Sequence, residues 1–267
     1  MEQTIGFIGA GNMAGAIISG ILSNDKGCRL YAYDIDRSKC ERFGDRVGCC
    51  SSIHEMIETC DCLFLAVKPQ VISRVLTELS EYTVDWNKKV FVTMVAGIST
   101  DYIASHFQGY TPAIVRIMPN TPMMLGYGAT GICANKNATD EQVDMIKALL
   151  SGAGVVCDVP EHQMNASISI NGSSPAYIFL FAKAVMDYAK SEGINEDDAL
   201  TLFSNTLIGS AHMLMESHMD PQSLIDMVTS PGGTTQEALR VFHEKQFCDI
   251  VGAAMAACTK RANELSR

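Results

Sequence analysis

Short apolar runs alternate with helical patterns along the first 160 residues. The run at 61–67 is continuous, which is typical of a strand covered on both faces of a sheet. A helical pattern at 12–22 separates the first two predicted strands. The predicted strands lie at 4–9, 29–34, 61–67, 89–95, 113–117 and 155–159. Strands that alternate with helices predict a parallel, doubly wound α/β sheet with helices on both faces.

The pattern changes after Pro160, beyond which no further strand is predicted. Ser174 followed by Pro175 is typical of an N-cap with proline at the first helical position. Residues 176–182 are apolar nearly all round, which indicates a helix buried in a core or against another subunit. The sequence therefore predicts two domains, residues 1–160 around a sheet and residues 161–267 built from helices.

Polar residues predict where the later helices begin. Gly193 should end the helix that contains residues 176–182. Asn195 and Asp220 are expected N-caps. Thr234 with Glu237 fits a capping box, which would place Thr234 at the N-cap and Thr235 in the first turn.

The chain has 267 residues and a formal net charge of −10, from 30 acidic and 20 basic side chains. Nucleic acid and a polybasic membrane contact are not expected, because both need clustered Lys and Arg. No apolar run reaches the roughly 18–20 residues of a spanning helix, and no signal peptide is expected at the start. The ten cysteines then favour reduced thiols in the cytoplasm, and their spacing does not predict a metal site.

The sequence Gly9-Ala10-Gly11-Asn12-Met13-Ala14 fits the pattern G-x-G-x-x-[G/A]. It follows a predicted strand and opens a predicted helix, which is the context in which this pattern binds a dinucleotide. The first glycine permits the tight turn, the second lets the backbone approach a pyrophosphate, and the alanine allows close packing. The expected cofactor contacts are Gly9, Gly11, Asn12, Met13 and Ala14. A glycine-rich turn without a ligand is the alternative.

Asp34 ends the second predicted strand, 20 residues after Ala14. An acid at this place accepts hydrogen bonds from the adenosine ribose of a bound dinucleotide. Its charge repels a 2′-phosphate and so favours NADH. Arg37 offers the opposite device, since an arginine there can meet the phosphate of NADPH. The sequence favours NADH on the strength of Asp34 and leaves NADPH open as the alternative.

The stretch Ser230-Pro231-Gly232-Gly233-Thr234-Thr235 is the most informative part of the second domain. Two glycines let the backbone come close to a ligand. Uncapped N–H groups at the following helix start can bind a carboxylate, and the Thr235 hydroxyl lies beside them. An ordinary glycine-rich turn is an equally good interpretation of these residues alone.

The chain resembles the pyrroline-5-carboxylate reductases over almost its whole length. The resemblance rests on five segments in the family's order, of which the last is the most specific. They are residues 6–14, 66–70 (Ala-Val-Lys-Pro-Gln), 118–122 (Met-Pro-Asn-Thr-Pro), 172–177 (Gly-Ser-Ser-Pro-Ala-Tyr) and 226–235 (Asp-Met-Val-Thr-Ser-Pro-Gly-Gly-Thr-Thr). The resemblance implies a Rossmann domain followed by a helical dimerisation domain, the layout of 6-phosphogluconate dehydrogenase. It also implies reduction of the cyclic imine Δ1-pyrroline-5-carboxylate to L-proline, the last step of proline biosynthesis, with NADPH or NADH.

The resemblance assigns roles to single residues. Thr235 is the implied catalytic residue, with its hydroxyl on the imine nitrogen, while the N–H groups of Gly233, Thr234 and Thr235 hold the substrate carboxylate. A protonated imine is already electrophilic, so the site needs orientation more than a strong acid. The other implied substrate contacts are Asn120, Tyr177, Ser230 and Gly232. The other implied cofactor contacts are Ala66, Val67, Lys68, Pro69, Ala96, Gly97 and Asn120. Close packing without a ligand stays open for Gly97, and Tyr177 could equally bury its ring.

The chain departs from the family pattern in two places. Asn171 and Ser174 stand where the family has Ser and Gly, and residues 51–54 offer no Asn near the adenosine. Ser174 is compatible with a helix cap. Asn171 leaves the local polar contacts open.

Two other functions fit parts of the sequence. A β-hydroxyacid dehydrogenase shares the two-part layout but needs a proton acceptor, usually a lysine, and residues 161–171 contain none. A non-catalytic dinucleotide-binding sensor would keep the glycine-rich turn but has no use for residues 230–235. Turnover of pyrroline-5-carboxylate distinguishes the three.

The apolar stretch 176–182 and the alanine-rich last helix also predict the assembly. A surface this apolar should be buried between subunits. We expect an intertwined homodimer through residues 161–267, and a larger ring of dimers stays open.

Overall fold

The computed structural model describes residues 3–24 and 27–266. The chain divides into two compact units. Unit 1 comprises the described residues up to Pro175 together with those from Ala257 onward, and unit 2 is Ala176–Ala256. No described helix is long and apolar enough to cross a membrane.

Unit 1 is built on a sheet whose described strands lie in the order β3-β2-β1-β4-β5-β6-β7-β8. The strands are β1 (Thr4–Ile8), β2 (Arg29–Tyr33), β3 (Gly48–Cys49), β4 (Cys62–Leu65), β5 (Val90–Thr93), β6 (Ala113–Met118), β7 (Gly128–Ala134) and β8 (Gly154–Asp158). Strands β1 to β6 are parallel, β7 pairs antiparallel with β6, and β8 is parallel to β7. The mainly parallel α/β sheet is confirmed, and β8 is its last strand.

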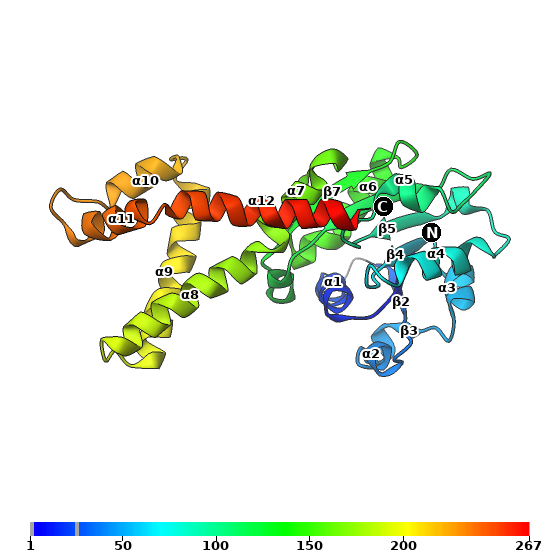
Figure 1. Ribbon diagram of the computed structural model, residues 1–267. Coiled ribbons are helices and arrows are strands. Elements are labelled where there is room, and N and C mark those ends of the chain that lie inside the picture. The colour runs from blue at the N-terminus through cyan, green and yellow to red at the C-terminus, as the bar shows by residue number, and fades with distance from the viewer. Residues whose placement is uncertain (1–2, 25–26, 267) are drawn as a thin grey trace. The chain divides into compact units, whose positions relative to one another are not determined.

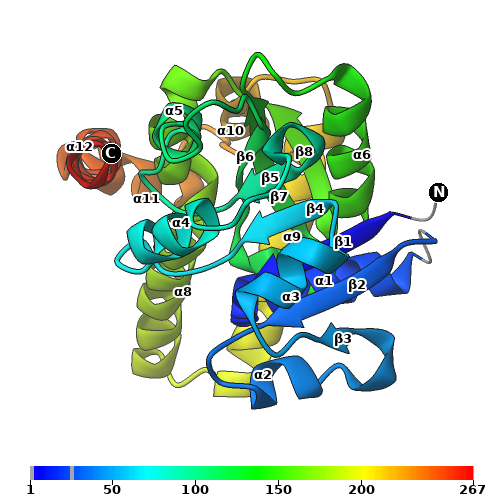
Figure 2. The same cartoon turned by 90° about the vertical axis from the view of Figure 1, so that its right-hand side faces the viewer.

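Helices cover both faces of this sheet, as Figure 2 shows for α4 and α6 on opposite sides of the strands. The helices are α1 (Asn12–Ser23), α2 (Ser38–Glu41), α3 (Ile53–Thr59), α4 (Ile72–Ser80), α5 (Thr100–Ala104), α6 (Asp140–Leu150) and α7 (Met164–Ser167). Alternate residues of β1 divide between two cores: Phe7 packs with α1 and α6, and Ile8 packs with α3, α4 and α5. Burial on both faces explains why the central strands are apolar without alternation.

Two strands were absent from the sequence prediction. β3 has only two residues. β7 reads Gly-Ala-Thr-Gly-Ile-Cys-Ala, in which small residues replace the β-branched and aromatic side chains that mark a strand. Its antiparallel pairing with β6 also corrects the prediction of a sheet that is parallel throughout.

Unit 2 contains most of the long helices, which Figure 1 labels. They are α8 (Ser174–Ser191), α9 (Glu196–Glu216), α10 (Pro221–Met227), α11 (Thr234–Glu244) and α12 (Phe247–Leu265), with the first two residues of α8 and the end of α12 in unit 1. Large apolar side chains stay uncovered: Phe179, Leu180 and Leu202 are 66%, 69% and 67% exposed. Such side chains gain hydrophobic stabilisation only if another surface covers them.

The helix starts follow the sequence prediction at two of four places. Asn195 caps α9 by accepting from the N–H groups of Asp197 and Asp198, and Asp220 caps α10. The prediction was wrong at Ser174, because a π-helical turn precedes α8 and the Ser174 hydroxyl instead donates to the Ser169 carbonyl at 3.0 Å.

The capping box predicted for Thr234 and Glu237 was also wrong. Gly233 is the N-cap of α11, and no side chain caps this helix start. The side chain of Gln236, the residue before Glu237, accepts a hydrogen bond from the Gly232 N–H at 2.6 Å. Glu237 instead pairs with Arg240. The helix therefore starts with Thr234 as its first residue and Thr235 as its second.

Candidate functional site

The turn between β1 and α1 has the geometry of a phosphate-binding loop. Gly9 has φ +100°, and a Cβ there would lie 2.5 Å from the Ala66 carbonyl oxygen, so only glycine fits. A Cβ at Gly11 would meet nothing within 4 Å, which leaves open space over the turn. Gly11 is the N-cap of α1 and gives it no side-chain cap. The N–H groups of the first helical residues, 12–14, therefore face a site suited to a pyrophosphate.

This turn lies at the switch point of the sheet. β1 pairs with β2 on one side and with β4 on the other, so the chain order reverses there. Ligands of open α/β sheets bind at the carboxyl ends of the strands beside such a point. Ala66 and Val67 follow β4 at this edge and are partly exposed, and Lys68 is exposed. These predicted cofactor residues therefore share one edge of the sheet with the glycine-rich turn.

Asp34 follows β2 at the same edge, but its carboxylate is engaged with the protein. One oxygen accepts the Ala10 N–H at 2.9 Å. The other accepts the Asp36 N–H at 3.0 Å and lies 3.3 Å from the Lys39 ammonium. Burial alone would raise the pKa of Asp34, but these donors outweigh burial and lower that pKa below its ordinary value. Asp34 thus holds the glycine-rich turn, and Lys39 is a neighbour that sequence reasoning missed.

Gly97 lies in the turn after β5 with φ +75°. A Cβ there would lie 2.8 Å from the Leu265 carbonyl oxygen at the end of α12. The close neighbour of Gly97 in this chain is therefore backbone, while Ala96 beside it keeps partial exposure.

Asn120 follows β6 and is 8% exposed. Its amide is used within unit 1: Oδ1 accepts the Ala129 N–H at 2.9 Å and Nδ2 donates to the Asn171 carbonyl at 3.2 Å. Asn171 donates in turn to the carbonyls of Met118 and Ala129, at 2.7 and 3.0 Å. Asn171, which stands where the family has serine, therefore connects the end of β6 with the start of β7 through its side-chain amide.

The second group of predicted residues belongs to unit 2. Gly232 has φ +72°, and the Gly233 N–H donates to the Ser230 carbonyl at 3.0 Å, which closes the turn before α11. The first helical hydrogen bond runs from the Glu237 N–H to the Gly233 carbonyl. The N–H groups of Thr234, Thr235 and Gln236 thus form the open helix start, with Thr235 half-buried. Tyr177 lies in the first turn of α8 and is also half-buried.

Sequence reasoning missed a charged group in the middle of the sheet. Arg116 lies in β6 and is 3% exposed. A single arginine inside the apolar strand Ala-Ile-Val-Arg-Ile-Met was the available signal, because charged residues are almost never fully buried unless paired.

Comparisons with known proteins agree across the chain. Residues 161–265 match a family model described as pyrroline-5-carboxylate reductase dimerisation, and residues 4–97 match one described as NADP oxidoreductase coenzyme F420-dependent. The pyrroline-5-carboxylate reductase of Escherichia coli K12 is 34% identical over 272 residues and covers both chains completely. The corresponding protein of Arabidopsis thaliana is 33% identical over 98% of this chain and 95% of its own.

Solved structures give the same result. A pyrroline-5-carboxylate reductase from Coxiella burnetii matches with a TM-score of 0.90 and 31% identity over the whole of both chains. A pyrroline carboxylate reductase from Plasmodium falciparum, solved with NADP bound, matches with a TM-score of 0.90 and 25% identity over 99% of this chain and 98% of that one.

Proposed function

Because the chain belongs to the pyrroline-5-carboxylate reductase family, we propose that the open start of α11 binds the substrate carboxylate and that Thr235 holds the imine nitrogen. The protein is an NAD(P)H-dependent oxidoreductase that reduces Δ1-pyrroline-5-carboxylate to proline, and it forms a homo-oligomer. The observation that carries the proposal is a helix start with Gly233 as its N-cap and no side-chain hydrogen bond that caps it.

The carboxylate would accept hydrogen bonds from the N–H groups of Thr234, Thr235 and Gln236. These groups lack helical partners, and the helix dipole adds partial positive charge at the same end. Gly233, which the resemblance included, uses its N–H within the preceding turn. The expected donor set thus moves one residue along the chain.

The residues of unit 1 fit a dinucleotide. Gly9 and Gly11 leave the turn open, residues 12–14 offer N–H groups to its pyrophosphate, and Ala96 with Gly97 would border the nicotinamide. When bound, the reduced cofactor supplies the hydride. That hydride would reduce the C=N bond of the substrate ring. The chain's own residues orient the substrate ring. A Thr235 hydroxyl bonded to the imine nitrogen would fix which ring carbon faces the hydride.

We further propose that NADPH is the preferred cofactor. The Asp34 carboxylate is satisfied by two backbone N–H groups, and its charge is offset by Lys39. An acid compensated in this way repels a 2′-phosphate less, and Lys39 adds a positive charge beside it. Lys39→Ala should therefore raise the KM for NADPH and leave that for NADH unchanged. Equal KM changes for both cofactors would contradict the preference.

A proline substitution tests the carboxylate site directly. Thr234 is the first residue of α11, and Gly233 before it is extended at φ −82°, ψ 167°. Proline is well tolerated at this position and accepts an extended residue before it, yet it removes one N–H donor. Thr234→Pro should weaken inhibition by the product L-proline about 10-fold or more, the value of one hydrogen bond to a charged group.

Thr234→Ala is the matched control, because it removes the same side chain but keeps the N–H. It should bind L-proline as the wild type does. L-Prolinamide lacks the charged carboxylate, so Thr234→Pro should not change its weaker inhibition. If L-proline inhibits Thr234→Pro as strongly as the wild type, the start of α11 does not bind the carboxylate.

The uncovered apolar residues of unit 2 support an intertwined homodimer through residues 161–267 as the form of the homo-oligomer, and we include a ring of such dimers in the proposal. Sedimentation should show a dimer or a multiple of it at micromolar concentration, and a stable active monomer would contradict this. Cys40, Cys60 and Cys62 are buried and form no disulfide, which supports a reducing compartment such as the cytoplasm.

A further inference from the structure

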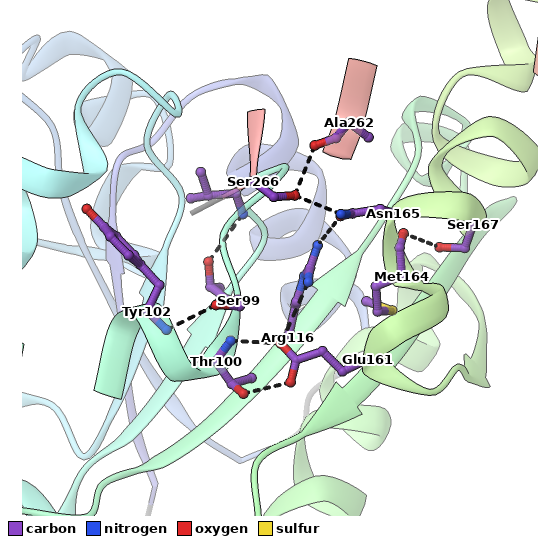
Figure 3. Close-up of polar contacts among 12 residues, drawn as sticks. Ser99, Thr100, Tyr102, Arg116, Glu161, Met164, Asn165, Ser167, Ala262 and Ser266 are labelled. Atoms are coloured by element: carbon purple, nitrogen blue, oxygen red, sulfur yellow. Dashed lines mark hydrogen bonds and ion pairs between the residues drawn. The ribbon is translucent and has the colours of Figure 1, made fainter. Parts of the chain in front are cut away.

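Arg116 is a cation in the middle of β6 with an unusual set of partners. Its side chain is 4% exposed, and Nη1 lies 3.6 Å from Glu161 Oε1. Nη2 donates to Asn165 Oδ1 at 2.8 Å, while Nε has no partner among the described residues. A well-packed apolar side chain stabilises such a place as well as a buried ion pair does. We therefore look for a role of Arg116 other than stabilisation. Its partner Glu161 contacts the start of α5, and its partner Asn165 contacts the end of α12 (Figure 3).

Glu161 reaches the first residue of α5. Its Oε1 accepts the Thr100 N–H at 2.8 Å, and its Oε2 accepts the Thr100 hydroxyl at 2.7 Å. Both carboxylate oxygens are thus aimed at one residue, three positions after Gly97. Arg116 holds this carboxylate in place from the other side (Figure 3).

Asn165 reaches the last turn of α12. Its Nδ2 donates to Asn263 Oδ1 at 2.9 Å and to Ser266 Oγ at 2.7 Å. Its Oδ1 is fixed as the acceptor by Arg116, so the amide can point its donors only toward α12. The Ser266 hydroxyl donates onward to the Ala262 carbonyl at 3.0 Å.

The end of α12 then closes on Gly97. The Leu265 carbonyl carbon and the Ser266 nitrogen would lie 2.9 and 3.1 Å from a Cβ at Gly97. The backbone from Gly97 to Thr100 is therefore held at both ends by one network, whose centre, Arg116, is buried. Contact with α12 holds the first end and Glu161 holds the second, and Arg116 connects the two.

We propose that Arg116, Glu161 and Asn165 are positioning residues for the nicotinamide half of the cofactor, acting through the backbone of residues 96–100. This inference rests on the proposed function, which places Ala96 and Gly97 beside the nicotinamide. None of the three residues has to touch the cofactor or the substrate for this role.

Asn165→Ala tests the proposal, because it releases the end of α12 and removes an acceptor from Arg116. The dissociation constant for NADPH, followed by nicotinamide fluorescence, should rise about 5- to 30-fold, as the loss of one or two hydrogen bonds implies. Binding of 2′,5′-ADP, which lacks the nicotinamide half, should match the wild type. Asn165→Asp keeps an acceptor for Arg116 and can accept from the Ser266 hydroxyl, so it should recover most of the NADPH affinity.

Thr139→Ala is the matched control for stability. It removes the capping box that Thr139 and Gln142 form at the start of α6, which includes no residue of the network, and should lower the melting temperature without changing the binding of either ligand. Equal weakening of NADPH and 2′,5′-ADP by Asn165→Ala, or no change in either, would overturn the proposal. If Asn165→Ala does not fold, Ser266→Ala carries the same test with the same two ligands. Turnover by the wild type is measured separately, so that failure of the proposed function is distinguished from failure of this inference.

Discussion

Replacing Asp34 by alanine should weaken both cofactors together. The Asp34 side chain is 11% exposed and accepts the Ala10 N–H at 2.9 Å, inside the turn that receives the pyrophosphate. Without that acceptor the Ala10 N–H has no fixed partner and the turn loses its support. The KM values for NADPH and NADH should therefore rise by similar factors, since both cofactors carry the same pyrophosphate.

The magnitude follows from the three contacts of the carboxylate. A hydrogen bond to a charged group contributes about 1.5–3 kcal/mol, which applies to the sheltered bond from Ala10. The Lys39 side chain is 42% exposed, and an ion pair at such a place contributes only about 0–1 kcal/mol. The bond from the Asp36 N–H is exposed and adds little. Asp34→Ala should thus lower the free energy of unfolding by about 2–4 kcal/mol.

Urea unfolding at several pH values checks this figure. The pKa of Asp34 is lowered from its ordinary value of 3.8 in the folded protein. Its stabilisation is therefore fully present above that value and is lost as the pH falls through the folded pKa. The difference between the wild type and Asp34→Ala should be constant near neutral pH and shrink in acid below about pH 4.

Asp36→Ala is the matched control, because Asp36 is in the same loop, is 53% exposed and uses its carboxylate for Ser38 and Lys39. It should change stability by less than about 1 kcal/mol and leave both KM values unchanged. The reasoning is refuted if Asp34→Ala raises the KM for NADH, lowers that for NADPH and unfolds like the wild type. Asp34 would then be a ribose ligand and charge selector, as the sequence first indicated.

Three further predictions concern other parts of unit 1. Gly97→Ala places a Cβ 2.8 Å from the Leu265 carbonyl oxygen in a residue with φ +75°. It should lower the free energy of unfolding by about 1–3 kcal/mol in urea titrations. Wild-type stability would show that the end of α12 moves aside without cost. Glu161→Gln leaves Arg116 buried without a carboxylate and should lower the free energy of unfolding in urea by about 2–4 kcal/mol. The double variant Arg116→Met with Glu161→Gln should recover a part of this loss, because no charge is then buried. No recovery would contradict the argument from charge. Gly9→Ala forces a Cβ to 2.5 Å from the Ala66 carbonyl and should abolish detectable NADPH binding in a fluorescence titration, and wild-type affinity would contradict the assigned turn.

The sequence predicted the fold where the apolar pattern was strong. β4 and β5 are continuous apolar runs, and the sheet buries both on two faces. β7 was not predicted, because its glycines and alanines give no alternation of apolar and polar residues. The start of α11 was displaced by one residue because Gln236 reaches back to Gly232, and such a bond depends on the turn rather than on residue spacing.

The candidate site divides in the same way. The glycine-rich turn could be predicted because its chemistry is local: the turn, the open N–H groups and the helix start all lie within residues 9–14. The bond from Ala10 to Asp34 and the bond from Arg116 to Asn165 could not be predicted, because each joins distant segments that the fold brings together. Ala10 is 24 residues from Asp34, and Asn165 is 49 residues from Arg116.

The role of Thr235 is tested most directly by kcat/KM for pyrroline-5-carboxylate in Thr235→Ala and Thr235→Ser, with NADPH saturating. A hydroxyl that holds the imine nitrogen as the hydride arrives stabilises the transition state more than the bound substrate. Thr235→Ala should therefore lower kcat and kcat/KM together, by about 10- to 100-fold for one hydrogen bond to a charged group. Thr235→Ser keeps the hydroxyl and should retain most of the activity. Wild-type kcat/KM in Thr235→Ala would show that the imine nitrogen is held by another group.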